Sequence, residues 1–280
     1  MIGNRDYRQF SSIVAFAVAF FGLVWLLRSL STSELFANTI QPNSLSLAAV
    51  GRVAAFLILI ASLQSSYLVD GKNWLFDILR DRRWKTRAIL GFGIGAIMTT
   101  SVVVMFVRSK QAEWTLNSMS FDMAGVMALR TGVSFVGVIF EEMLFRGYIL
   151  GVSERIMPFA FAATFSSSIF GLAHLGNPNE SLSGAIYAGL FGLLLCASAR
   201  IAGSIWLPIG VHAGWNWSES FIWGSANSGN DSSESIFTMH LSGNETFLNG
   251  GFVGLEGSAF VLVGMLVLLI FLVTQSKPNR

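Results

Sequence analysis

Long runs of apolar residues dominate the chain, and polar residues gather in the shorter segments between them. A helix needs about 20 predominantly apolar residues to cross the ~30 Å hydrocarbon core of a bilayer. Eight runs come close to this length or exceed it, at 11–30, 46–68, 88–107, 122–150, 157–175, 182–200, 204–224 and 257–274. The pattern therefore predicts an all-α integral membrane protein, a bundle of about eight transmembrane helices.

Composition supports this class and excludes others. Of the 280 residues, 53% are hydrophobic and 12% are charged, whereas an average soluble domain carries about 25% charged residues. The formal net charge of +2 is too small to indicate a nucleic-acid partner. The single cysteine, Cys196, permits neither an internal disulfide nor a CxxC metal site. We expect residues 1–280 to form a single polytopic membrane domain.

The first apolar run follows two basic residues, Arg5 and Arg8, a pattern shared by secretory signal peptides and by anchor helices. The run at 11–30 is long for the apolar region of a signal peptide. No small-residue cleavage site of the A-x-A kind follows it. We therefore interpret it as the first membrane anchor.

Basic residues also orient the chain. The loop at 70–87 is rich in lysine and arginine, which stay on the cytoplasmic side of a membrane. The alternation of spans then places both termini, Arg155 and Arg200 inside, and the acidic and polar segment 225–256 outside. The short loops favour the plasma membrane of a prokaryote as the location.

One stretch inside the fourth run, FEEMLFRGY, contains Glu141, Glu142 and Arg146. A charged side chain within a membrane span costs at least about 2.5 kcal/mol, so it indicates a function unless it has a partner. On a helix, Glu142 and Arg146 share a face, whereas Glu141 points about 100° away and is left to face a cavity. There it could act as a general base. The alternative is a buried ion-pair network that only joins helices.

Polar residues recur at helical spacing in two later runs. Phe170 and His174 share a helix face in FGLAH, and His212 and Asn216 share one in HAGWN. Pro208 lies four residues before His212 and can kink that helix. The alternatives to a catalytic role are a structural histidine at a helix end and a hydrogen-bonding face between helices.

Together these residues suit the hydrolysis of an acyl bond. A carboxylate and a histidine can activate water, and a second histidine and an amide can stabilise an oxyanion. The sequence contains neither the GxSxG turn of serine hydrolases nor the HExxH helix of zinc proteases. Water must therefore be activated without either arrangement.

The same three stretches resemble a known family. EEMLFR is similar to its EExxxR motif, FGLAH to its FxxxH motif and HAGWN to its HxxxN motif. This is the CPBP family of intramembrane proteases, which includes the type II CAAX prenyl endopeptidases and the bacteriocin-immunity (Abi) proteins. The motifs occur in the family's order, and the resemblance covers about 120–220, the expected catalytic core.

The resemblance implies an eight-helix peptidase whose active site opens within the bilayer. Glu141 would activate water together with His174. His212 and Asn216 would stabilise the oxyanion. The residues expected to support this set are Glu142, Arg146 and Phe170.

The sequence leaves open whether the protein uses a metal ion. We expect no cofactor, because the glutamate mechanism needs none. The alternative is zinc held by Glu141, His174 and His212, which could supply three ligands and leave the fourth position open.

The expected partners are membrane lipid and a membrane-associated protein or peptide substrate, with its lipidation left open. A non-catalytic scaffold or immunity protein of the same fold is the alternative function. A transporter is disfavoured because no inverted repeat is visible. Two further charges within apolar runs, Arg52 and Arg130, could bind a substrate carboxylate, or snorkel or pair with an acidic residue.

Overall fold

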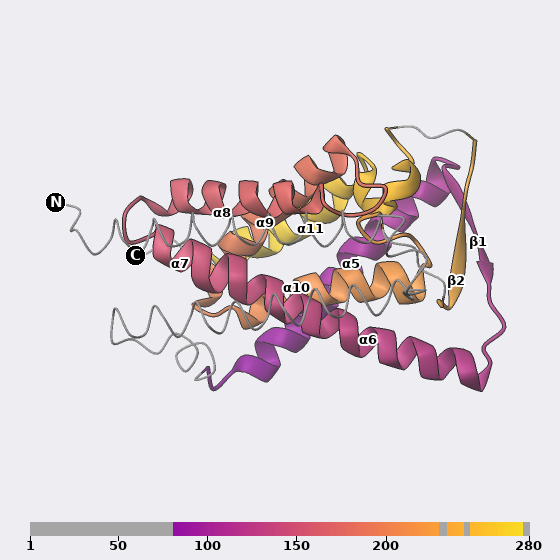
Figure 1. Ribbon diagram of the computed structural model, residues 1–280, viewed down its shortest axis with the longest axis horizontal. Helices are drawn as coiled ribbons and strands as arrows, with labels where there is room; N and C mark the ends of the chain where they lie inside the picture. The colour runs from indigo at the N-terminus through magenta and orange to yellow at the C-terminus, as the bar shows by residue number, and fades with distance from the viewer. Residues whose placement is uncertain (1–80, 230–233, 244–246, 277–280) are drawn as a thin grey trace, which may run out of the picture.

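The computed structural model describes residues 81–229, 234–243 and 247–276. The expected spans at 11–30 and 46–68 lie outside these residues, as does Arg52. The other six expected spans are all helical, and most of the described chain is helix (Figure 1). The total of eight helices therefore remains a prediction.

The helices follow the apolar runs closely. They are α5 (Trp84–Arg108), α6 (Phe121–Glu142), α7 (Leu150–Ser153), α8 (Phe159–His174), α9 (Leu182–Ala202), α10 (Trp206–Trp217) and α11 (Val261–Gln275). Among the described residues, three helical stretches are long and apolar enough to cross a membrane: Trp84–Arg108, Phe121–Ser153 and Leu182–Ala202. These stretches support the membrane class.

Two π-helical segments extend the helices that carry charged residues. One, η1 (Met143–Ile149), joins α6 to α7 without a break, and the other, η2 (Ser218–Ile222), continues α10. Such segments are rare and often occur at functional sites, because the extra residue in the turn changes the direction in which side chains point. The sequence pattern predicted neither segment.

The mostly helical structure, which fits the predicted all-α membrane class, also contains one short two-stranded sheet. Strands β1 (Ala112–Leu116) and β2 (Phe237–Leu241) pair antiparallel, with Trp114 opposite Met239. They lie at the end of the molecule opposite α7 and the start of α5 (Figure 1). Two single-turn 3₁₀ segments, η3 (Gly251–Val253) and η4 (Leu255–Gly257), then lead into α11. The strands were missed because both are short and lie in polar connecting segments.

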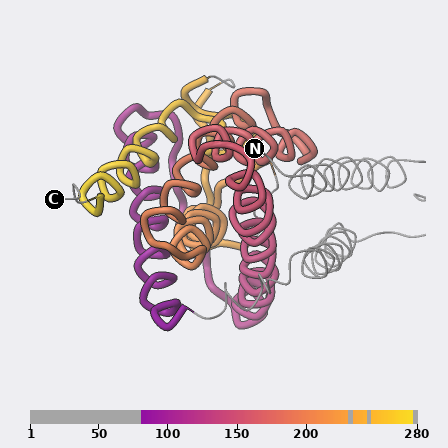
Figure 2. Tube along the Cα trace, turned by 90° about the vertical axis from the view of Figure 1, so that its left-hand side faces the viewer, coloured from indigo at the N-terminus to yellow at the C-terminus, as the bar shows by residue number. Residues whose placement is uncertain are grey.

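Helix α10 occupies the middle of the described bundle. It lies between α5 and α6, with α9 also in contact with it (Figure 2). Glycines permit a close approach to α5: a Cβ atom at Gly95 would lie 2.1 Å from the Val211 carbonyl oxygen, and one at Gly214 would lie 2.1 Å from that of Phe92. Small residues at helix contacts are the usual means of close packing in membranes.

This packing predicts unequal effects of two neighbouring substitutions on α5. Gly95→Ala should destabilise the protein by about 1–3 kcal/mol, because the added methyl group forces α5 and α10 apart. Gly93→Ala is the matched control, because nothing lies within 4 Å of a Cβ atom there. Thermal unfolding in detergent measures both. Equal melting temperatures for the two variants would contradict the close contact.

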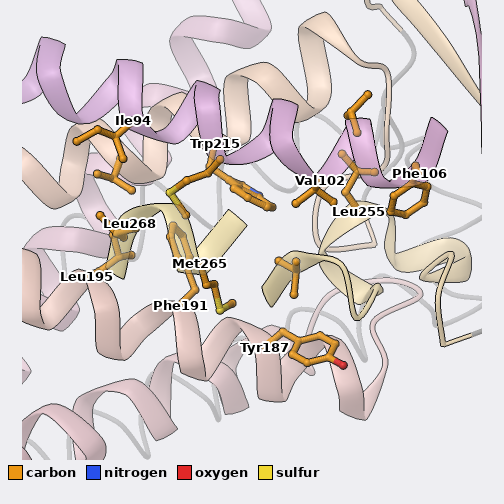
Figure 3. Packing of buried hydrophobic residues seen from close by; sticks show 14 of the residues in the cluster. Ile94, Val102, Phe106, Tyr187, Phe191, Leu195, Trp215, Leu255, Met265 and Leu268 are labelled. Carbon is orange, nitrogen blue, oxygen red and sulfur yellow. The ribbon is translucent and has the colours of Figure 1, made fainter. Parts of the chain in front are cut away.

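A large apolar cluster fills the space between α5, α9, α10 and α11. Trp215, which is 2% exposed, projects from α10 into this cluster and contacts Phe191 at 5.9 Å between ring centroids. Met265 and Leu268 of α11 lie close by in the same cluster (Figure 3). The cluster fixes the half of α10 that carries the polar residues described next.

Candidate active site

Glu142 is the most deeply buried member of the charged cluster. Its Oε1 accepts a hydrogen bond of 2.8 Å from Arg146 Nη1, and neither side chain is exposed. A second hydrogen bond of 2.9 Å joins the same oxygen to Nδ1 of His212. Arg146 Nη2 also donates to the backbone carbonyl of Gly192 on α9. The predicted pairing of Glu142 with Arg146 is confirmed, and it links α6, η1, α9 and α10.

His212 lies between the two adjacent glutamates. Its Nδ1 faces Glu142, and its Nε2 lies 3.8 Å from Glu141 Oε2, beyond hydrogen-bonding distance. The side chain of Glu141 is 37% exposed, whereas that of Glu142 is fully buried. The structure therefore separates the glutamates as their helical spacing predicted. It also brings His212 to both of them, a contact that the sequence did not predict.

The ring of Phe170, one turn before His174, packs between the histidines and Arg146. Its ring is 1% exposed, and its centroid lies 4.5 Å from that of His174 and 5.9 Å from that of His212. The Arg146 guanidinium lies over the same ring at 4.4 Å. One buried aromatic side chain thus packs against a residue from each of the three motifs.

His174 has a defined hydrogen bond on one nitrogen. Its Nδ1 lies 2.8 Å from the backbone carbonyl oxygen of Phe170. A carbonyl oxygen only accepts, so Nδ1 carries the proton. In the neutral ring, Nε2 is then left as an acceptor.

Both histidines line a small pocket. The pocket contains about 380 Å³ of space between atoms, of which about 20 Å³ is open to the centre of a water molecule. That volume holds about one water. Trp215, Phe191 and Glu256 form other parts of the wall. Hydrolysis needs such a water next to groups that can activate it.

Two of the predicted catalytic residues do not line this pocket. Glu141 approaches it only through His212, and Asn216 lies half-buried one turn further along α10. The structure therefore brings His174 and His212 to one cavity. Glu141 and Asn216 lie at the margin of that cavity. Glu141 lies close to His212 in space, and Asn216 lies one turn from His212 on the same helix.

The residues proposed as zinc ligands do not form a metal-binding group. Within the described part of the chain, no three side chains of His, Cys, Asp or Glu converge closely enough to hold a metal ion. The geometry does not fit the zinc alternative, so no step below passes through a metal.

Arg130 has an acidic partner on a distant segment. Its Nη1 lies 2.5 Å from Glu234 Oε2, just before β2, and both side chains are partly exposed. The contact ties the N-terminal half of α6 to the segment that carries β2. This agrees with the structural interpretation of Arg130.

A second group of acidic side chains, not singled out from the sequence, lies on the far side of Trp215. The Trp215 indole N–H points at two carboxylates, at 3.0 Å from Glu219 Oε2 and 2.8 Å from Glu256 Oε1. Glu180, in the loop before α9, is close enough to Glu256 to be repelled by it. We call Glu180, Glu219 and Glu256 the outer glutamate cluster. Glu219 could have been noticed as an acid within the expected span 204–224, whereas the sequence contains no signal for Glu256.

The loop residue Glu180 predicts a pH dependence of stability. Burial, reinforced by the negative charge of Glu256, raises its pKa from 4.5 to about 7. The folded state therefore holds this proton more tightly than the unfolded state, and stability falls as the pH rises from about 4.5 to 7. Glu180→Gln should raise the melting temperature at pH 8 and leave it nearly unchanged at pH 4. A variant that gains nothing at pH 8 would contradict the raised pKa.

One protein family is similar to part of the chain. Residues 123–218 match the family model described as Type II CAAX prenyl endopeptidase Rce1-like. This segment of the chain is similar to that family. No curated protein and no solved structure matches the chain.

The matched segment contains all three motifs. It begins in α6, ahead of Glu141, and ends at Ser218, just after Asn216. At the level of the family, the match indicates a CAAX-type protease, which is a hydrolase. Glu219 and Glu256 lie beyond the matched segment.

Proposed function

We propose that this protein hydrolyses a peptide bond of a membrane-associated protein or peptide, with water activated by Glu141 and His174. One observation carries the proposal: His212 lies between Glu141 and Glu142, at a cavity that holds about one water molecule and is also lined by His174. General acid–base groups placed around a single water are what peptide hydrolysis requires.

The hydrogen bond of His174 supports its proposed role. Because Nδ1 donates to the Phe170 carbonyl, Nε2 is available to accept a hydrogen bond from the water. Phe170 fixes the ring in this orientation by packing against it. His174 can therefore orient the water while Glu141 removes its proton.

The charges around His212 suit an oxyanion donor. Glu141, Glu142 and Arg146 together carry one net negative charge, which a protonated His212 neutralises. In that form Nδ1–H donates to Glu142, and Nε2–H faces the side on which Glu141 lies. A positively charged donor at that position, helped by the Asn216 amide, would stabilise a developing oxyanion.

The reaction then proceeds in two steps. The water oxygen bonds to the carbonyl carbon as its proton passes to Glu141, and the carbonyl oxygen gains the negative charge that His212 and Asn216 stabilise. The intermediate collapses, the carbon–nitrogen bond breaks, and Glu141 returns the proton to the leaving amine. Glu142 and Arg146 hold His212 in place throughout.

We also propose the plasma membrane of a prokaryote as the location, with both termini in the cytoplasm. The basic segment at the start of α5 supports this orientation. Arg87 pairs with Asp81, Arg200 pairs with Glu154, and Asp81 and Arg200 border one cavity. These residues therefore gather at one end of the bundle, as the positive-inside rule requires.

A peptidase assay on the purified protein tests the proposal. We expect cleavage of some members of a lipid-anchored peptide pool in proteoliposomes, detected by mass spectrometry. His174→Ala should reduce the rate at least about 100-fold, the size expected when a group that helps to activate the water is lost. Leu172→Ala, on an exposed position of the same helix, is the matched control.

The same assay with a chelator tests the metal-free mechanism. We expect activity to persist after chelation, and a loss that zinc restores would overturn the mechanism. Cleavage that is unaffected by His174→Ala would instead favour a scaffold or immunity role of the same fold.

A further inference from the structure

Helix α6 has an exposed apolar face in its N-terminal half, which lies along the lower edge of the bundle in Figure 1. In the stretch Phe121–Ser153, 17% of the most apolar window is buried, against 44% in Trp84–Arg108 and in Leu182–Ala202. Two of its large apolar side chains, Leu129 and Val136, are 61% and 59% exposed. This face is open either to lipid or to a further helix.

The exposed residues of this face have the spacing of a contact between two helices. Asp122, Gly125, Leu129, Gly132 and Val136 recur at intervals of three and four residues, and all five are exposed. We call them the α6 stripe. Such a repeat forms one line of side chains that a second helix can follow. Nothing lies within 4 Å of a Cβ atom at Gly125 or Gly132, and small residues let a neighbouring helix approach closely in a membrane.

The charge at the start of the α6 stripe distinguishes between possible occupants. Within residues 81–229, 234–243 and 247–276, no basic side chain forms an ion pair with Asp122. A second copy of the chain packed in parallel on the same stripe would bring two Asp122 carboxylates together, and like charges at an interface are unfavourable. A helix with a positive charge at the level of Asp122 is favoured instead.

The span expected at 46–68, which lies outside the described residues, has a matching sequence pattern. Arg52, Ala55, Leu59 and Ser62 recur at intervals of three, four and three residues, the intervals that separate the first four members of the α6 stripe. Set side by side in parallel, the two segments place Arg52 opposite Asp122. The same register places a small residue, alanine or serine, opposite each of the two glycines.

The connections of the chain agree with a parallel arrangement. Successive spans alternate in direction, so 46–68 and α6 run the same way, with α5 reversed between them. The described chain starts at Asp81, which borders one cavity with Arg146 and Glu154 on the continuation of α6. The segment from Leu68 to Asp81 reaches up to about 40 Å when extended. The span 46–68 can therefore lie on α6 and still connect to α5.

The other expected span, 11–30, fits the α6 stripe less well. It runs antiparallel to α6, and its basic residue, Arg28, lies near the end of the run, where a long side chain reaches the interface by itself. Arg52 lies six residues inside its own run, where an unpaired charge is costly. Arg52 therefore needs an acidic partner on a neighbouring helix, and Asp122 can provide it.

We infer that the α6 stripe is the docking surface for the chain's own segment 46–68. In this contact Arg52 pairs with Asp122, and Ala55 and Ser62 pack over the two glycines. Because α6 ends at Glu142, directly after Glu141, the contact holds the helix that carries both glutamates of the candidate active site. The inference concerns helix packing and does not depend on the proposed peptidase activity.

Disulfide formation in the full-length protein tests the contact. The background is Cys196→Ala, which removes the single native cysteine. Ala55→Cys and Gly125→Cys are introduced together, and the protein is oxidised in membranes, digested and mapped by mass spectrometry. We expect an intramolecular disulfide between these two positions that a reductant removes. Close helices at these positions meet the short Cα separation that a disulfide requires.

A matched control and a second cysteine pair make the result specific. Ala124→Cys is also exposed but lies about 100° from Gly125 around the helix. Combined with Ala55→Cys, it should crosslink at least about tenfold less, because a disulfide forms only over a narrow range of distances. Ser62→Cys with Gly132→Cys is the second expected pair, to be used if the first variant fails to fold. Melting temperatures show which variants are folded.

Charge exchange tests the ion pair separately. In the Ala55→Cys/Gly125→Cys protein, Asp122→Arg sets two positive charges opposite each other and should lower the disulfide yield about fivefold. Adding Arg52→Asp restores opposite charges and should recover most of the yield. A local disturbance of the start of α6 by Asp122→Arg would not be reversed by the second change, and that result would overturn the pairing.

Each other occupant of the α6 stripe gives a distinct result. A disulfide between differently tagged copies that carry Gly125→Cys alone would identify a second copy of the chain. A disulfide from Trp25→Cys to Gly125→Cys, with none from Ala55→Cys, would assign the stripe to the span 11–30. No disulfide from either span, in protein that keeps the wild-type melting temperature, would leave the stripe to lipid. Each of these three results would overturn the inference.

Discussion

Glu141→Gln should abolish peptide cleavage while the protein stays folded. We expect a rate at least about 100-fold lower, because glutamine cannot take the proton of the attacking water. The fold should tolerate the change, because the Glu141 side chain is 37% exposed and its distance of 3.8 Å from His212 is too long for a hydrogen bond. The measurements are cleavage in proteoliposomes and the melting temperature in detergent.

Glu142→Gln is the matched control for this prediction, one residue along the same helix. Glu142 accepts hydrogen bonds from both Arg146 and His212 with no exposed surface. A neutral amide there leaves the Arg146 guanidinium buried without its counter-charge, so stability should fall along with activity. If both variants lost activity equally and both kept the wild-type melting temperature, the proposed division of roles between the two glutamates would be wrong.

Arg146→Ala should remove most of the folded protein. The substitution removes one partner of a fully buried ion pair, which typically costs about 3–5 kcal/mol. That amount is a large part of the 5–15 kcal/mol by which proteins are usually stable. It also removes the hydrogen bond to the Gly192 carbonyl and the contact with the Phe170 ring. The yield of monodisperse protein after detergent extraction, measured by size-exclusion chromatography, reports the effect.

Two further variants define what the Arg146 result means. Arg146→Lys keeps the positive charge but loses the planar set of donors, so it should recover only part of the stability. Arg130→Ala breaks a partly exposed pair with Glu234 and should cost no more than about 1 kcal/mol. A wild-type yield for Arg146→Ala, or an equal loss for Arg130→Ala, would contradict the central role of the buried pair.

Much of this architecture could be predicted from the sequence, because the bilayer imposes a simple requirement on it. Each of the six expected spans within the described residues became a helix close to its expected bounds, since only regular helices satisfy their backbone hydrogen bonds in lipid. Helical spacing also separated Glu141 from Glu142, and this separation depends only on the turn of a single helix.

Contacts between side chains of different helices were harder to predict. Helical spacing placed His212 beside Asn216, and the resemblance to the family assigned these two residues to the oxyanion. The structure shows that the first partner of His212 is Glu142, 70 residues away in the sequence. The contact depends on the close packing of α10 against its neighbours and on the π-helical turn that follows Glu142. Neither the packing nor the turn leaves a periodic signal.

The sequence alone therefore determined the membrane class, the position of the apolar helices and the residues capable of chemistry, because these follow from hydropathy and from spacing within one helix. Only the tertiary structure decided which of those residues meet. It placed His212 between two glutamates and brought Glu256, from a polar outer segment, to the wall of the same cavity. The physical reason is that such contacts join side chains from separate elements, and their geometry is set by how whole helices pack.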